Sequence, residues 1–215
     1  MNIVHCNQGS QEWLNARCGL ITASMFKECR KRLKSGPNKG DFSSEAKQYA
    51  FRLACERISG ELLTEDKFET WEMRRGHELE PTARLLHEER EGILVEQVGF
   101  AVSDCGIYGA SVDGAIDDDG ISEYKCFVAP KSIMPIVLDH DISDTMDQIQ
   151  GGLWVTKKKW AHFCLYCPAL KKVGKELTVI PVERNQNYID EMIPDLAEFD
   201  GLVEKYIGKL TEKAA

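Results

Sequence analysis

Residues 110–128, ASVDGAIDDDGISEYKCFV, decide how this chain is interpreted. Apolar and polar residues alternate on either side of a DDDG turn, which is typical of two strands joined in a hairpin. Asp113 falls in the first strand, and Glu123 and Lys125 fall in the second. Because side chains alternate between the faces of a strand, Glu123 and Lys125 share one face. Two interpretations are open: a salt bridge on a surface hairpin, or a metal site.

The metal interpretation rests on the ligand preferences of magnesium. Mg²⁺ takes hard oxygen ligands and keeps several waters, so two carboxylates on paired strands form a good partial cage. Asp113 and Glu123 supply them if the hairpin pairs their strands. Lys125 beside them can orient an attacking water, while a bound metal lowers the pKa of that water and stabilises charge on a phosphate. The D-x9-E-x-K pattern thus predicts phosphodiester hydrolysis, although its spacing alone leaves the salt bridge equally open.

The composition indicates a protein with a real hydrophobic core. The 215 residues are 43% hydrophobic, with a formal net charge of −8. No apolar run approaches the roughly 18 residues of a transmembrane helix, so no membrane association is expected. The N-terminus lacks a basic segment followed by an apolar one, so we expect no signal peptide. The eight scattered cysteines are expected to be reduced thiols in the cytosol.

The net negative charge argues only mildly against a nucleic-acid partner, because the charges are segregated along the chain. Residues 27–39, KECRKRLKSGPNK, contain six basic residues and one acid, whereas residues 182–206 are rich in acids. A basic patch on an acidic protein therefore remains possible.

The order of the predicted elements indicates an α/β protein. Helical periods predict helices at residues 11–17, 25–34, 43–61, 70–92, 141–157 and 186–210. Runs rich in Val, Ile, Phe and Tyr predict strands at residues 93–103, 106–116, 121–128, 160–168 and 175–184. Thr22 or Ser24 is the expected cap of the second helix, and Asp141 or Ser143 that of the fifth. We expect a mixed central β-sheet flanked by α-helices, in a single domain over residues 1–215.

Four blocks of sequence resemble one known family. They are WLNARCGLITAS (13–24), RGHELEPTAR (75–84), GASVDGAIDDDGISEYKC (109–126) and MDQIQGGLWVTKKKWAHFCLYCP (146–168). Their order and separation resemble those of the phage lambda-type exonucleases, the YqaJ-like viral recombinases of the PD-(D/E)xK nuclease superfamily. Val112 departs from the pattern, since the family has a proline before the first aspartate, but that position supplies no ligand. Four blocks in register favour the metal site over the salt bridge and imply a restriction-endonuclease-like fold.

The resemblance implies roles for the hairpin residues. Asp113 and Glu123 resemble the metal-binding carboxylates of the family, and the backbone carbonyl of Tyr124 resembles a further ligand. Lys125 is similar to the catalytic lysine. The expected metal is Mg²⁺, as two ions, with Mn²⁺ as a possible substitute.

Two further positions match the family outside the hairpin. Glu80 is similar to an upstream acid that helps to hold the metals, although an ordinary solvated helix acid is the alternative and Glu78 is easily confused with it. Gln148 resembles a glutamine close to the metal-bound water. Its alternative is an ordinary polar face of a helix.

The first block resembles a site for a terminal 5′-phosphate. Arg17 and Ser24 match the family's phosphate-holding residues, and an arginine fork suits a phosphate. Lys34 falls where the family often has another basic contact, with a solvated lysine as the alternative. Trp13 either stacks on a base or packs in the core, and we expect the core.

The resemblance implies a Mg²⁺-dependent 5′→3′ exonuclease. Its expected substrate is linear double-stranded DNA, degraded to 5′-mononucleotides with a 3′ overhang left behind. The family implies a ring-shaped homotrimer, a single-strand annealing protein as partner, and a phage or prophage gene expressed in the bacterial cytoplasm. Two alternatives are an endonuclease on the same fold and an inactive DNA-end-binding recombination protein.

Two other patterns are not expected to bind metal. Cys164 and Cys167 form a C-x2-C pair, but no second pair lies at zinc-ribbon spacing, so buried thiols are expected. Four histidines share no metal-site spacing: His77, His87, His140 and His162.

Overall fold

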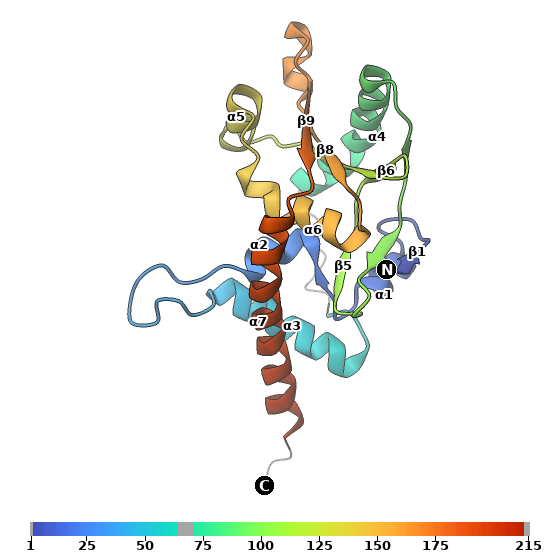
Figure 1. Cartoon of the computed structure of the whole chain (residues 1–215). Coiled ribbons are helices and arrows are strands. Elements are labelled where there is room, and N and C mark those ends of the chain that lie inside the picture. Colours follow the sequence, from blue (N-terminus) through green and yellow to red (C-terminus); the bar gives the residue numbers. More distant parts are fainter. Residues whose placement is uncertain (1, 64–70, 213–215) are drawn as a thin grey trace.

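Two mixed β-sheets form the frame of the molecule (Figure 1). The computed structural model describes residues 2–63 and 71–212. The first sheet has the order β1-β4-β5-β2 and contains β1 (Asn2–Val4), β2 (Ile21–Thr22), β4 (Phe100–Val102) and β5 (Tyr108–Ala110). The second has the order β3-β6-β7-β8-β9 and contains β3 (Val95–Glu96), β6 (Gly114–Ile116), β7 (Gly120–Lys125), β8 (Trp160–Tyr166) and β9 (Leu177–Glu183).

Each sheet contains one parallel pair of strands. β2 pairs with β5 and β7 pairs with β8 in parallel, whereas the other neighbouring strands are antiparallel. The predicted α/β class with mixed strand directions is confirmed. The strands divide between two sheets, however, where the sequence pattern predicts one.

This division arises because two predicted strands break in the middle. Residues 93–103 divide into β3 and β4, and residues 106–116 divide into β5 and β6. Gly99 lies at the first break, where a Cβ atom would stand 2.0 Å from the carbonyl oxygen of Val4. Only glycine allows the chain to pass so close to β1. Asp113 lies at the second break, directly before β6.

α-Helices pack around and between the sheets. The described residues contain α1 (Gln11–Arg17), α2 (Phe26–Cys29), α3 (Ser44–Ser59), α4 (Trp71–Glu91), α5 (Pro130–Asp139), α6 (Met146–Thr156) and α7 (Gln186–Thr211). The long α7 runs beside α3, and both enclose the largest core cluster with the first sheet (Figure 1). α1, α3, α4 and α7 are confirmed close to their predicted ends.

The second sheet is covered on both faces. Ile149 and Leu153 of α6 pack with Ile121 of β7 in one core cluster. Ala83 of α4 packs with Tyr124 in another. Because residues 121 and 124 differ by an odd number, they point to opposite faces of β7. Glu123 and Lys125 therefore share the face that carries α6.

The predicted helix over residues 25–34 is wrong beyond Cys29. A 3-10 turn, η1 (Ala23–Met25), leads into α2, which ends at Cys29. The following residues pair with the loop instead, since the backbone N of Leu33 donates to the carbonyl of Asp41 at 2.8 Å. Backbone groups that are satisfied in this hairpin cannot continue a helix. Figure 1 shows the loop extending away from the sheets.

The residues expected to cap helices do not act as N-caps through their side chains. Thr22 Oγ1 and Ser24 Oγ lie 3.3 Å apart and hydrogen-bond to each other. α6 begins only at Met146, after the 3-10 turn η2 (Ser143–Thr145). Asp141 Oδ1 accepts a hydrogen bond from the backbone N of Ser143 at 2.9 Å, so it stabilises the turn that precedes the helix.

α5 is absent from the sequence-based expectations. Pro130 occupies its first turn, where a missing N–H costs little, but Pro135 lies inside the helix and obscures the helical pattern. Ile136 is buried, and Ile133 and Val137 pack half-buried against the same core cluster as α6.

The remaining sequence expectations concern the thiols and the membrane. All eight cysteines are free, and Cys164 and Cys167 are buried, as expected. None of the helices within residues 2–63 and 71–212 has the length and apolar character needed to span a bilayer.

Candidate active site

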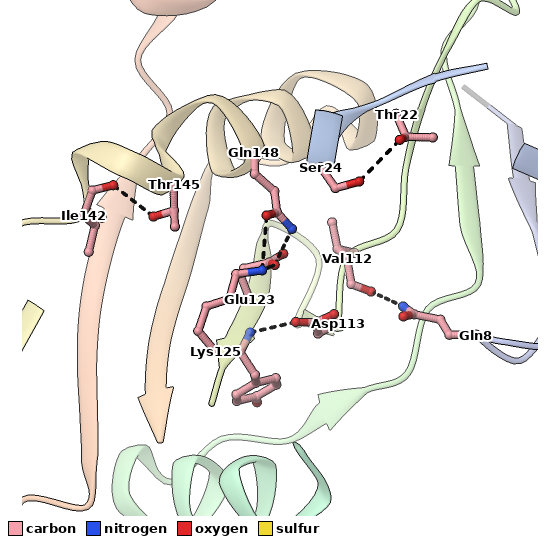
Figure 2. A network of polar contacts seen from close by, with 11 residues as sticks. Gln8, Thr22, Ser24, Val112, Asp113, Glu123, Lys125, Ile142, Thr145 and Gln148 are labelled. Carbon is pink, nitrogen blue, oxygen red and sulfur yellow. Dashed lines mark hydrogen bonds and ion pairs between the residues drawn. The ribbon is translucent and has the colours of Figure 1, made fainter. Parts of the chain in front are cut away.

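The hairpin places Asp113 beside the strand that carries Glu123. β6 and β7 pair antiparallel with Gly114 opposite Ser122. The backbone N of Asp113 donates to the carbonyl of Ser122 at 3.2 Å. Its carboxylate Oδ2 accepts from the backbone N of Tyr124 at 2.7 Å (Figure 2). Asp113 is therefore anchored to β7 at both its backbone and its side chain.

Glu123, Lys125 and Gln148 form one hydrogen-bonded group. Lys125 Nζ donates to Glu123 Oε1 at 2.7 Å and to Gln148 Oε1 at 3.2 Å. Gln148 Nε2 donates to the same Glu123 oxygen. Figure 2 shows Gln148 reaching down from α6 toward the end of β7. The ion pair exists, but Glu123 is only 5% exposed, so the surface-hairpin interpretation is wrong.

Glu80 approaches the group from α4. Its Oε1 accepts from Arg84 Nη2 at 2.8 Å, and the same nitrogen donates to the carbonyl of Asp113 at 3.1 Å. Glu80 is half-buried in the pocket wall, whereas Glu78 is exposed and outside that wall. The helix geometry thus distinguishes two acids that the sequence leaves easily confused.

Arg17 and Ser24 reach the same pocket from the N-terminal segment. Arg17 Nη1 donates to Ser111 Oγ at 3.2 Å, and its guanidinium lies 4.1 Å from the centre of the Trp13 ring. Trp13 Nε1 donates to Ser111 Oγ at 2.8 Å. Burial lowers the pKa of Arg17, but the group remains a cation at neutral pH. The expectation that Trp13 packs in the core is wrong, because it forms part of the half-buried pocket wall.

These residues enclose one cavity of about 480 Å³, lined by Arg17, Ser24, Glu80, Asp113, Glu123, Tyr124, Lys125 and Gln148. Lys34 does not line it; that residue is exposed after α2. The structure therefore brings together all the predicted site residues except Lys34, and their roles stay predictions.

Several wall residues were missed from the sequence. Ser111 joins Trp13 to Arg17, and Gln8 Nε2 donates to the carbonyl of Val112 at 2.8 Å (Figure 2). Ser132 of α5 also lines the cavity. These contacts connect segments that lie far apart in the chain, so they cannot be predicted from the spacing of residues in a local sequence pattern. The Ser111 position next to Val112 and Asp113 was the one available signal.

The carboxylates give the pocket an excess of negative charge. Burial, and next the neighbouring Glu123 carboxylate, raise the pKa of Asp113 well above its usual range. Burial by itself would lower the pKa of Lys125, but Glu123 and Asp113 outweigh it, so its pKa is raised. Lys125 is thus an ammonium group, and a cation near Asp113 would relieve the cost of its charge.

The donor set fits magnesium. Within residues 2–63 and 71–212, no three His, Cys, Asp or Glu side chains converge into a complete protein cage. Mg²⁺ does not require one, because it binds through one or two carboxylates and keeps its waters. The hard oxygens in the pocket include the Asp113, Glu123 and Glu80 carboxylates and the Tyr124 carbonyl.

Two of the four histidines contact each other in the structure, although their positions in the sequence form no metal-site pattern. His87 of α4 and His162 of β8 hydrogen-bond through ring nitrogens 2.9 Å apart, and His87 Nδ1 lies 2.9 Å from the Tyr124 hydroxyl. Burial, and next His162, lower the pKa of His87 to about 4. This neutral pair supports β7 from the face opposite the pocket.

The fold and pocket define an α/β protein with the alkaline-exonuclease fold. LHK-Exo, an alkaline exonuclease from Laribacter hongkongensis, is 27% identical over 94% of this chain and 96% of its own, with TM-scores of 0.78 and, in complex with dAMP, 0.80. A phage-related exonuclease from Haemophilus somnus 129PT shares the fold at a TM-score of 0.63, with 16% identity over 89% of this chain and 94% of that one.

The sequence comparisons give the family. Residues 12–159 match the model of the YqaJ-like viral recombinase domain. ExoD of Escherichia coli K12 is 37% identical over 70 residues, which are 33% of this chain and 70% of ExoD. The chain belongs to the YqaJ-like viral recombinase family.

Proposed function

We propose that this protein is a Mg²⁺-dependent exonuclease that degrades one strand of linear double-stranded DNA from 5′ to 3′. It would act through a single domain formed by residues 1–215. The observation that carries the proposal is the shared pocket: Asp113, Glu123, Lys125 and Gln148 meet in the same cavity as Arg17. A hydrolytic group and a phosphate-binding cation in one cavity suit a strand that is held by its end while it is cut.

Asp113, Glu123 and the carbonyl of Tyr124 would hold the metal, with Glu80 as a further acid. Bound Mg²⁺, as two ions or with Mn²⁺ in its place, supplies Lewis-acid stabilisation of the phosphate and lowers the pKa of water. Arg84 holds Glu80 and the Asp113 carbonyl together, which keeps the α4 acid next to the hairpin.

Lys125 and Gln148 would orient the attacking water. Lys125 Nζ donates hydrogen bonds to Glu123 and Gln148, which places its ammonium group beside the carboxylates. Gln148 accepts from Lys125 and donates to Glu123, so the three side chains hold one another in place. Water attacks phosphorus in line, the bond to the 3′-oxygen breaks, and the 3′-oxygen leaves as a hydroxyl, so the proton that water loses is balanced by the one that this oxygen takes up. The phosphate then stays on the 5′-carbon of the next nucleotide.

Arg17 and Ser24 would hold the 5′-phosphate of the strand end. A guanidinium binds phosphate with two parallel hydrogen bonds, and Trp13 and Ser111 hold this one in position. With the end held there, the first phosphodiester is the bond presented for hydrolysis. Each cycle releases a 5′-mononucleotide and leaves a new 5′-phosphate for Arg17, so the other strand is left as a 3′ overhang.

The assembly and setting of the enzyme are also part of the proposal. We infer a ring-shaped homotrimer around DNA, because a ring permits a basic channel within an acidic protein and would make digestion processive. The 3′ overhang is the substrate of a single-strand annealing protein, the proposed partner. We place the pair in the cytoplasm of a bacterial host, encoded by a phage or prophage.

A labelled duplex tests the activity. On a linear duplex with one strand labelled at its 3′ end, Mg²⁺ should produce progressive shortening from the 5′ end, with mononucleotides as product, and EDTA should abolish it. Cutting of closed circular DNA would indicate an endonuclease on the same fold. Binding to DNA ends without digestion would indicate an inactive recombination protein, and either result would overturn the proposal.

A further inference from the structure

A charged cluster next to Gln148 in the sequence connects α2, α6 and α7. Arg30, the residue directly after α2, donates through Nη1 to Asp147 Oδ1 of α6 and through Nε to Asp195 Oδ2 of α7, the latter at 2.8 Å. The hydroxyl of Tyr188, also on α7, donates to Asp147 Oδ1 at 2.6 Å. We call these four residues, Arg30, Asp147, Tyr188 and Asp195, the Arg30 clamp.

The clamp is a poor source of stability. The Asp147 side chain is 11% exposed and that of Arg30 is 22% exposed, so both charges lose most of their hydration. The desolvation of a buried ion pair offsets much of its Coulomb attraction. A planar guanidinium instead fixes the relative positions of the two carboxylates, because its N–H donors point in set directions.

The clamp acts on the first turn of α6, where Asp147 receives its bonds from outside the helix. The N-cap of α6, Thr145, makes no side-chain capping bond. Asp147 lies in that turn and is immediately followed by Gln148, which faces Glu123 and Lys125. Adjacent residues on a helix project about 100° apart, so any rotation or slide of the turn moves both side chains together.

We propose that the Arg30 clamp positions Gln148 in the pocket. The inference rests on the proposed nuclease function and assigns Arg30 and Asp147 as positioning residues that do not touch the substrate. By fixing the first turn of α6 to α2 and α7, the clamp holds the Gln148 amide at the distance needed to bond both Glu123 and Lys125. Its loss leaves the carboxylates and Lys125 in place but frees Gln148.

Arg32 provides a matched control. It lies two residues beyond Arg30 and also pairs with α7, through Arg32 Nη2 and Glu198 Oε2 at 2.6 Å. The Glu198 side chain is 64% exposed. The bond leads to α7 alone, so Arg32→Met removes a similar cation without releasing α6.

Hydrogen exchange tests the positioning without relying on activity. The amides of residues 150–152 report on the first turn of α6, because helical N–H groups bond to carbonyls four residues earlier. In the full-length protein, Arg30→Met should speed their exchange by about 10-fold or more, and Arg32→Met by less than about twofold. Unchanged protection in Arg30→Met would overturn the proposal, whatever the protein does to DNA.

Kinetics test whether the effect passes through Gln148. Arg30→Met should lower kcat on a linear duplex by about 10- to 100-fold with KM little changed, since small misplacements of a reacting group have effects of that size. In a Gln148→Ala background the same substitution should change kcat by less than about twofold. Independent, multiplying losses would overturn the proposal.

A double substitution separates the loss of positioning in Arg30→Met from a loss of folding stability. Arg30→Met leaves Asp147 as a buried unpaired charge, so the protein can lose stability for that reason alone. Arg30→Met/Asp147→Leu removes both charges and should retain the wild-type fold with the same loss of kcat. If the wild type itself fails to digest DNA, the proposed function fails, while the exchange measurement still decides the clamp.

Discussion

At the scale of single residues, the two carboxylate oxygens of Glu123 have different roles. Its Oε1 accepts from both Lys125 and Gln148, which leaves Oε2 as the candidate ligand for a cation. The two carboxylate oxygens of Asp113 also differ in their roles. Its Oδ2 accepts a hydrogen bond from the backbone N of Tyr124, and Oδ1 is the candidate ligand. Each carboxylate thus has one oxygen held by the protein, which orients it before any metal arrives.

Arg17 should govern the preference for 5′-phosphorylated ends. Arg17→Ala removes a charged hydrogen-bond donor, and such bonds contribute about 1.5–3 kcal/mol, so digestion of 5′-phosphorylated duplex at limiting substrate should fall about 10- to 100-fold. Digestion of 5′-hydroxyl duplex should change little. Lys209, exposed in the last turn of α7, gives the control: Lys209→Ala should remain near wild type. Equal losses on both kinds of end would contradict the assignment of Arg17.

His87 should make the fold sensitive to acid. Its pKa is lowered from 6.5 to about 4, so the unfolded chain binds a proton that the folded protein rejects between these values. Stability is fully present above pH 6.5 and falls as pH drops toward 4, by on the order of 3 kcal/mol. His87→Gln, which hydrogen-bonds without titrating, should flatten the pH dependence of urea unfolding over this range. A wild-type slope in His87→Gln would refute the effect.

At the scale of elements, α6 packs on α2 through a position where only glycine fits. A Cβ at Gly151 would stand 2.5 Å from the Phe26 ring. Gly151→Ala should therefore lower the free energy of unfolding by about 1–3 kcal/mol through overpacking. At Gly201 in α7 a Cβ would meet nothing within 4 Å. Gly201→Ala should instead raise stability by about 0.5–1 kcal/mol, as alanine favours a helix. Urea unfolding of both variants checks the contrast, and equal effects would contradict it.

The secondary-structure elements differ in how well they can be predicted from the sequence. Residues 110–128 predict the hairpin correctly because strand alternation and a turn are local properties, and Asp113 and Glu123 follow from them. The break at Gly99 depends on the backbone of Val4, almost a hundred positions away, so no window of sequence reveals it. α5 was missed for a different reason, since Pro135 inside the helix mimics a breaker.

The same limit applies to the site. Arg17, Glu80 and Gln148 were reached only through resemblance between blocks, because their spacing from the hairpin carries no physical signal. The Ser111 contacts and the Arg30 clamp were not reached at all. Both consist of contacts between side chains of separate elements, and such contacts depend on tertiary packing.

At the scale of the whole molecule, the net charge of −8 has to be reconciled with a DNA substrate. The proposed ring would do so by placing basic side chains in its channel and acidic ones on its exterior. The protein should therefore sediment as three chains at micromolar concentration, and digestion should persist when competitor DNA is added after the first turnovers. A monomer at the concentration of the assay would contradict the ring and the processivity derived from it.

Substitution of Lys125 tests the proposed hydrolysis more directly than any other change. With Mg²⁺ and a linear 5′-phosphorylated duplex, single-turnover digestion by Lys125→Met should be slower than wild type by about 10²-fold or more, because an electrostatic stabiliser has been lost from a buried site. Binding of the duplex end, measured in EDTA, should be retained. Lys125→Met should therefore hold a bound but undigested duplex, and digestion at the wild-type rate would contradict the catalytic role of Lys125.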